Sequence, residues 1–182
     1  MFVPRSYAIR LTICGMLVAL SVVLGGLLKV PVSLFGVYAL KISFGMIPVL
    51  IVAFLYGPLY GAMCGALADL LQALLFPAGA FNPLFTIVGG LLGLLPALFF
   101  MRNRHFTFLR ILLSVFVSQA FCSVVLNTLI ISLVYGLNPA VLLPPRALTQ
   151  AIVIPIFSVI SYALLKVIST QHRLGMREYT IS

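Results

Sequence analysis

Long apolar runs occupy nearly the whole chain, and the medium around them decides what it can fold into. Six such runs cover about 8–28, 42–56, 58–76, 83–101, 108–135 and 143–168. Of the 182 residues, 63% are hydrophobic and 7% are charged, whereas soluble domains have roughly 45–50% apolar and about 25% charged residues. Because a soluble fold of this length cannot bury so much apolar surface, we predict an all-α integral membrane protein, a single domain of six transmembrane helices.

Two of the runs need comment. The first follows Arg5 and Arg10 as a signal peptide would, but it continues through Leu28 without a small-residue cleavage site, so we expect it to stay as the first helix. The second, 42–56, is shorter than the roughly 20 residues that a span requires. We therefore expect it to lean on its neighbours.

The cations favour one orientation of the six helices. With the N-terminus inside, eight Lys and Arg side chains fall on the cytoplasmic side and three on the other. The first set is Arg5, Arg10, Arg102, Arg104, Arg110, Lys166, Arg173 and Arg177, and the second is Lys29, Lys41 and Arg146. This excess predicts that both termini are cytoplasmic, in the plasma membrane of a bacterium. The net charge of +9 is then a topology signal and not a nucleic-acid-binding surface.

Residues for covalent chemistry are missing from the pattern. Cys14, Cys64 and Cys122 lie singly in apolar runs, without CxxC spacing or a Cys/His cluster, so we predict neither disulfides nor a metal site. His105 and His172 have no acid at a useful spacing. No phosphate-binding GxxxxGK[ST] loop occurs. We expect no catalytic residue, no cofactor and no intrinsic ATPase activity.

Asp69 is the only aspartate, and it lies inside the third run, about 16 Å from the inner end of the helix. A carboxylate at that depth costs about 2.5–3.5 kcal/mol, so it should have a partner or face a water-filled cavity. Arg146 and Gln150 of the sixth run lie at a comparable level, and we expect Lys41 to open the second helix from the same side. A polar cavity open to the outside and a structural ion pair between helices both fit this pattern.

Aromatic and polar residues surround the expected opening of this cavity. They are Phe44, Phe76, Phe81, Asn82, Phe85 and Thr86, with Gln119 and Asn127 of the fifth run as further contributors. Rings, amides and two cations together are typical of a site for a flat, hydrogen-bonding anion. Taken singly, each phenylalanine fits a core or lipid-facing position better than a ligand-stacking one, so only the group as a whole supports a site.

Small residues form a stripe on the third helix. At 100° per residue, Ala62, Ala66, Asp69 and Ala73 fall within about 60° of one another. The first helix has a shorter stripe, Gly15 and Ala19. Such stripes let another backbone approach closely, and they predict either packing within the bundle or a docking surface for a second membrane protein.

Two stretches of the chain resemble a known family. The run "LKISFGMIPVLIVAFLYGPLYGAMCGALADLLQALLFPAGAFNPLFTIVGGLLGLLPAL" and the later "PPRALTQAIVIPI" are similar to S components of energy-coupling factor (ECF) transporters, most closely the folate-specific type. The resemblance extends from about Arg10 to Lys166 and includes the number and order of the spans.

The resemblance implies a six-helix protein that captures a vitamin from outside and docks on a transmembrane coupling subunit driven by two ATPase subunits. In the family, AxxxA-type residues on the first and third helices contact the coupling subunit. The matching positions here are Gly15, Ala19, Ala62 and Ala66, of which the first pair departs from a strict Ala pair. Loops such as 29–41 and 77–83 commonly close over the ligand, and both are rich in Gly and Pro.

Folate suits the expected site, because its pterin is flat and its glutamate tail is a dianion for Lys41 and Arg146. We expect the binding residues to be Lys41, Phe44, Asp69, Phe81, Asn82, Phe85, Thr86, Arg146 and Gln150. The same scaffold could instead take pantothenate or another small vitamin. A self-sufficient ion-coupled carrier usually shows repeats and several membrane acids, which this chain lacks. A ligand-free structural membrane subunit is the remaining alternative.

Overall fold

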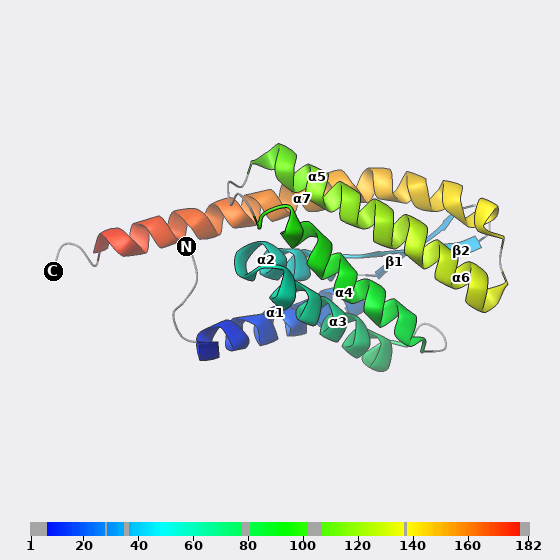
Figure 1. The fold of residues 1–182 in the computed structure, drawn as a ribbon, viewed down its shortest axis with the longest axis horizontal. Helices are drawn as coiled ribbons and strands as arrows, with labels where there is room; N and C mark the ends of the chain where they lie inside the picture. Colours follow the sequence, from blue (N-terminus) through cyan, green and yellow to red (C-terminus); the bar gives the residue numbers. More distant parts are fainter. Residues whose placement is uncertain are drawn as a thin grey trace.

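The computed structural model describes residues 7–27, 29–34, 37–77, 81–101, 107–136 and 138–178. Helices dominate this part of the chain and lie side by side as a bundle (Figure 1). The elements in order are α1 (Tyr7–Leu27), β1 (Lys29–Leu34), β2 (Val37–Ser43), α2 (Met46–Tyr56), α3 (Pro58–Leu75), α4 (Pro83–Leu98), α5 (Phe108–Gln119), the π-helix η1 (Ala120–Leu126), α6 (Asn127–Tyr135) and α7 (Pro139–Glu178).

The helices agree with the prediction of a helical membrane bundle. Because α5, η1 and α6 follow one another without a break, the described residues contain six helical segments. Four of them are long and apolar enough to cross a bilayer: Tyr7–Leu27, Pro58–Leu75, Phe108–Val134 and Pro139–Ile168. The other two, α2 and α4, are apolar but shorter.

Helix α2 is the centre of the bundle. Each of its residues from Ile47 to Phe54 is buried, and α1, α3, α4 and α7 all pack on it. A helix that is apolar on every side is stable only when it is surrounded. The expectation that this short run leans on its neighbours is therefore correct.

Helices α3 and α4 approach each other through glycines. A Cβ atom added to Gly93 would meet the carbonyl of Gly61, and one added to Gly89 would come within 2.7 Å of Asp69 Cβ. Gly65 faces Gly89 in the same way. Backbones come this close only where side chains are small, as in other membrane helix pairs.

The all-α class describes the bundle, but strands β1 and β2 form a β-hairpin where the sequence predicted a loop over 29–41 and the start of a helix at 42. Strands β1 and β2 are antiparallel, and Lys41 of β2 pairs with Pro31 of β1. Lys41 therefore does not begin the second helix. The β-branched Val and Ile residues of this segment favour extended backbone. Beyond β2, the buried Ser21 hydroxyl of α1 donates to the Gly45 carbonyl at 2.6 Å and ties the end of the hairpin to the bundle.

The two ends of the bundle differ. In Figure 1 the hairpin and the α6–α7 junction lie at one end, whereas α1 and α5 begin towards the other. Among the described cations, Arg10 lies near the start of α1, Arg110 near the start of α5, and Lys166 in the later part of α7. These three cations therefore belong to the end away from the hairpin.

Candidate functional site

A buried cation, Arg146, connects α7 to η1. Arg146 is 8% exposed, and its Nη1 donates to the backbone carbonyl of Ser123 at 3.2 Å. Helix α7 runs back along α5, η1 and α6 (Figure 1) and packs on all three. Because the packing is antiparallel, residues early in α7 lie opposite residues late in the continuous α5–η1–α6 helix. Arg146 therefore lies across from η1.

The π-helical geometry explains why a carbonyl is available to Arg146. In η1 the backbone bonds span five residues instead of four, and the Asn127 N–H accordingly bonds to the Cys122 carbonyl. When the chain returns to four-residue spacing in α6, one carbonyl is passed over. Ser123 O follows Cys122 O and accepts from Arg146 instead. Such π turns are frequent at functional sites.

Gln119, Ser123 and Asn127 follow one another at four-residue spacing along the continuous α5–η1–α6 helix. The Ser123 hydroxyl donates to Gln119 Oε1 at 2.7 Å, and Gln119 is 4% exposed. Asn127 comes four residues after Ser123 and has a buried Oδ1 without a hydrogen-bond partner. Gln150, one turn beyond Arg146 on α7, has a buried Oε1 in the same condition.

Helices α4, α6 and α7 carry most of the buried polar atoms that have no hydrogen-bond partner in the described structure, a set called here the polar cluster. Among the described residues, six buried side-chain atoms have no hydrogen-bond partner: Thr86 Oγ1, Asn127 Oδ1, Thr128 Oγ1, Arg146 Nε, Gln150 Oε1 and Ser161 Oγ. All but Ser161 belong to the early turns of these three helices, and α6 packs on both α4 and α7. Folded proteins pair nearly all such atoms, so the cluster is suited to a polar ligand that supplies the missing partners.

Asp69 lies on the α4 side of the bundle, at the level of Gly89, one turn from Thr86. It is half-buried on α3 and packs against Gly89 of α4. Helix α3 contacts α1, α2 and α4, whereas Arg146 and Gln150 are on α7, which packs on α2, α5, α6, η1 and β2. Asp69 and the α7 pair are therefore on helices that are not among the main packing pairs of the described residues, and their grouping in one site stays a prediction.

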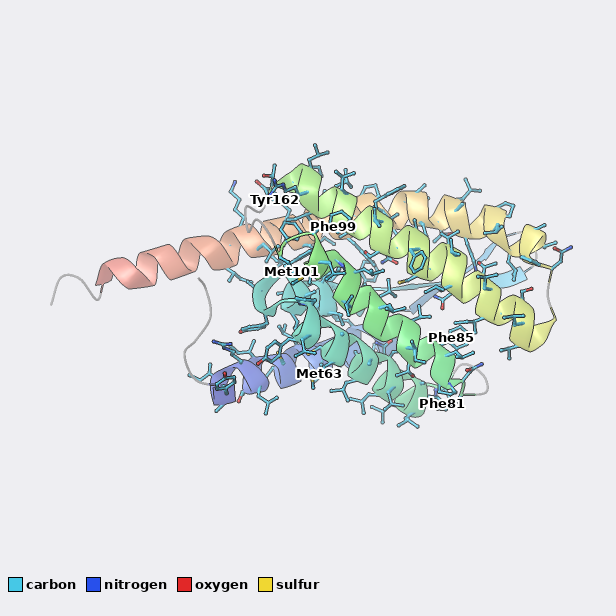
Figure 2. The ribbon with its side chains drawn as sticks, in the orientation of Figure 1. Met63, Phe81, Phe85, Phe99, Met101 and Tyr162 are labelled. Carbon is cyan, nitrogen blue, oxygen red and sulfur yellow. The ribbon has the colours of Figure 1, made fainter. Side chains whose placement is uncertain are left out.

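The predicted aromatic residues are also divided. Phe44 is half-buried and its ring lies 6.1 Å from that of Phe157 in the core. Phe81 and Phe85 lie together at the end of the bundle where α4 begins, far from Phe99 at the other end of α4 (Figure 2). Phe81 is 51% exposed and Phe85 half-buried, so both border this end of the bundle.

Two further predicted residues, Asn82 and Lys41, lie at a helix cap and in a strand. Asn82 caps α4, because its Oδ1 accepts the Leu84 N–H at 3.0 Å. Lys41 is in β2, which packs on α7; its side chain lies outside the described part of the structure. Strand β2 thus brings the hairpin next to the helix that carries Arg146.

The small residues of α1 and α3 have different environments. Gly15 and Ala19 are exposed, and a Cβ at Gly15 would meet no atom within 4 Å. Ala62 and Ala66 are half-buried beside Gly90 of α4. The α1 pair is therefore open, while the α3 pair is partly covered within the bundle.

Sequence reasoning missed Ser123, which bonds to Gln119 and Arg146, and Thr128, whose buried hydroxyl has no partner. The four-residue spacing of Gln119, Ser123 and Asn127 was the available signal. Metal ligands are a different matter: within the described residues, no three His, Cys, Asp or Glu side chains come together.

Comparisons with known proteins agree with the resemblance drawn from the sequence. The family model for the ECF transporter, substrate-specific component, matches residues 9–165. A folate transporter FolT from Clostridium novyi is 30% identical over 129 residues, covering 71% of this chain and 74% of that protein. A folate transporter FolT from Leuconostoc mesenteroides is 26% identical over 167 residues, covering 89% and 87%.

One solved structure is similar over most of the fold. A crystal structure of FolT bound with folic acid superposes with a TM-score of 0.73 at 29% identity, and the match covers 85% of this chain and 90% of that one.

Proposed function

The chain belongs to the substrate-specific components of ECF transporters, and from this premise we propose that it captures folate outside the cell for import. The relatives named as folate transporters and the fold shared with a folic acid complex support this choice of vitamin. Folate combines a flat ring that donates and accepts hydrogen bonds with an anionic glutamate tail.

The observation that carries the proposal is the set of unpaired polar atoms that α4, α6 and α7 bury. Thr86, Asn127, Arg146 and Gln150 each keep a buried atom without a partner, at a cost of about 1–3 kcal/mol for each group. A pterin provides both donors and acceptors, whereas the carboxylates of the glutamate tail provide acceptors for Arg146. Arg146 also has a charge that an anionic ligand would neutralise.

The proposed binding residues extend from this cluster to the neighbouring end of the bundle. They are Lys41, Phe44, Asp69, Phe81, Asn82, Phe85, Thr86, Arg146 and Gln150. The hairpin of β1 and β2, which contacts α7 through β2, would cover the ligand; residues 78–80 of the predicted 77–83 loop lie outside the described residues.

The proposed setting is the plasma membrane of a bacterium, with six transmembrane helices and both termini in the cytoplasm. Energy would come from a coupling subunit and two ATPase subunits. We propose that the coupling subunit contacts Gly15 and Ala19 on the open side of α1, together with Ala62 and Ala66 on α3.

The test is binding to the purified full-length chain in detergent. Radiolabelled folate, pantothenate and thiamine are offered separately, without ATP or partner subunits. We expect folate to be retained at nanomolar concentration and the other two to be ignored. Selective retention of pantothenate or thiamine would change the vitamin, and indifference to all three would contradict a substrate-binding role.

A further inference from the structure

Ser123 contacts two buried polar side chains at once. Its hydroxyl donates to Gln119 Oε1 at 2.7 Å, and its carbonyl accepts from Arg146 Nη1 at 3.2 Å. Gln119 and Arg146 are both buried, with 4% and 8% of their surface exposed. Ser123 is therefore the residue through which the polar groups of α5 and α7 are held relative to each other.

The direction of the hydrogen bond between Ser123 and Gln119 determines which end of the amide is used. A glutamine amide has an acceptor oxygen on one side and a nitrogen with two N–H donors on the other. Since Oε1 takes the Ser123 proton, the end of the Gln119 amide that Ser123 does not contact is the nitrogen with its two N–H donors.

Arg146 also contributes hydrogen-bond donors. A guanidinium has five N–H donors and no acceptor. One of its terminal nitrogens is engaged by the Ser123 carbonyl, and its Nε is buried without a partner. Gln119 and Arg146 together thus offer hydrogen-bond donors, and a ligand placed against them must provide acceptors.

We propose that Ser123 is a specificity-determining positioning residue, which holds the Gln119 amide so that the site selects an acceptor on the ligand. This inference rests on the proposed function, in which the ligand is folate. The pterin ring of folate has a carbonyl oxygen, an acceptor. In aminopterin an amino group, a donor, replaces that oxygen, and the pair therefore probes the orientation of the amide.

A purely structural role for Ser123 would have a different signature. If the hydroxyl only stabilised the π turn, its removal would lower the thermal stability and weaken both ligands to the same extent. If the hydroxyl orients Gln119, its removal frees the amide to rotate and present Oε1 to the amino group of aminopterin. The ratio of the two affinities separates these roles.

The experiment measures folate and aminopterin binding to the purified full-length chain and its variants. We expect the unaltered protein to prefer folate and Ser123→Ala to reduce this preference about tenfold, the effect of one lost buried hydrogen bond. Ser123→Thr, which keeps the hydroxyl, should restore the preference. Ser118→Ala is the matched control, because the Ser118 hydroxyl bonds only to the Ser114 and Val115 carbonyls of its own helix, at 2.8 and 3.0 Å.

Gln119→Glu provides a second test that does not alter Ser123. The change replaces the N–H donors with an acceptor oxygen, so we expect the affinity for folate to fall more than tenfold. If the unaltered protein binds folate tightly, two results would overturn the inference and leave the proposed function intact. One is a Ser123→Ala variant with an unchanged ratio of folate to aminopterin affinity. The other is a Gln119→Glu variant with full affinity for folate. An unaltered protein that binds no folate would overturn both.

Discussion

Arg146 is the residue at which burial and charge conflict most directly. The side chain is 8% exposed, and the hydrogen bond from its Nη1 ends on a neutral carbonyl. A buried cation without an opposite charge is expensive, because a carbonyl replaces only part of its hydration. An anionic ligand would remove this cost, which makes Arg146 the most informative single position to change.

We predict that Arg146→Ala weakens folate binding more than tenfold, because a charge-assisted hydrogen bond is worth about 1.5–3 kcal/mol. Isothermal titration of the purified protein measures the change. Arg110→Ala is the control, since Arg110 is exposed near the start of α5 and its loss should leave the affinity as it was. Full affinity in Arg146→Ala would exclude this side chain from the site.

The sequence identified part of the polar cluster at this scale. Arg146 and Gln150 were expected because a cation and an amide are unusual in an apolar run. Ser123 was not, because serines in membrane helices commonly bond to their own backbone, as Ser114 and Ser158 do here. The Ser123 hydroxyl instead contacts Gln119, next to a π turn that no local residue pattern announced.

Among the elements, the pairing of α3 with α4 depends most on the absence of side chains. A Cβ on Gly93 would collide with the Gly61 carbonyl, whereas a Cβ on Gly90 would lie 3.4 Å from the Ala62 carbonyl and 3.5 Å from Ala66 Cβ. The same helix therefore offers a tight and a tolerant position one turn apart.

We predict that Gly93→Ala destabilises the protein by about 1–3 kcal/mol, the usual penalty of overpacking, and lowers the midpoint of thermal unfolding in detergent. Gly90→Ala should have little effect or stabilise slightly, because alanine favours helix more than glycine does. Equal midpoints for Gly93→Ala and the unaltered protein would mean that the two backbones are further apart than described.

The hairpin shows the limit of prediction from the sequence for this chain. The apolar runs located the helices because a membrane imposes length and hydrophobicity on each span. Residues 29–43 carry no such constraint, and their Gly and Pro residues indicated a loop. Their strand pairing depends on contacts distant in sequence, such as that of β2 with α7, which periodicity does not reveal.

At the scale of the whole molecule, α1 and α3 present different surfaces to a partner. Gly15 and Ala19 are exposed, whereas Ala62 and Ala66 lie half-buried beside α4. A bulky residue at Ala66 would press on Gly90 before it met another protein. The α1 pair therefore provides the cleaner test of docking.

We predict that Gly15→Leu with Ala19→Leu abolishes folate uptake and leaves folate binding unchanged, because bulky side chains prevent close approach of a second helix. Uptake is measured in cells that express the chain with the coupling and ATPase subunits, and binding on the purified protein. Ala147→Leu with Ala151→Leu, at the same spacing on the exposed side of α7, is the control. Normal uptake by the α1 variant would place the docking surface elsewhere.

The burial of α2 has a consequence for how the protein enters the membrane during synthesis. Its 11 residues extend only about 16 Å, roughly half of the hydrocarbon thickness, and its sides contact protein. Such a segment is poorly suited to partition into lipid by itself as it leaves the translocon. Because Gly57 alone separates it from α3, the two helices should insert as one unit. Helix α1, which is synthesised earlier and packs on both, should already be in the membrane.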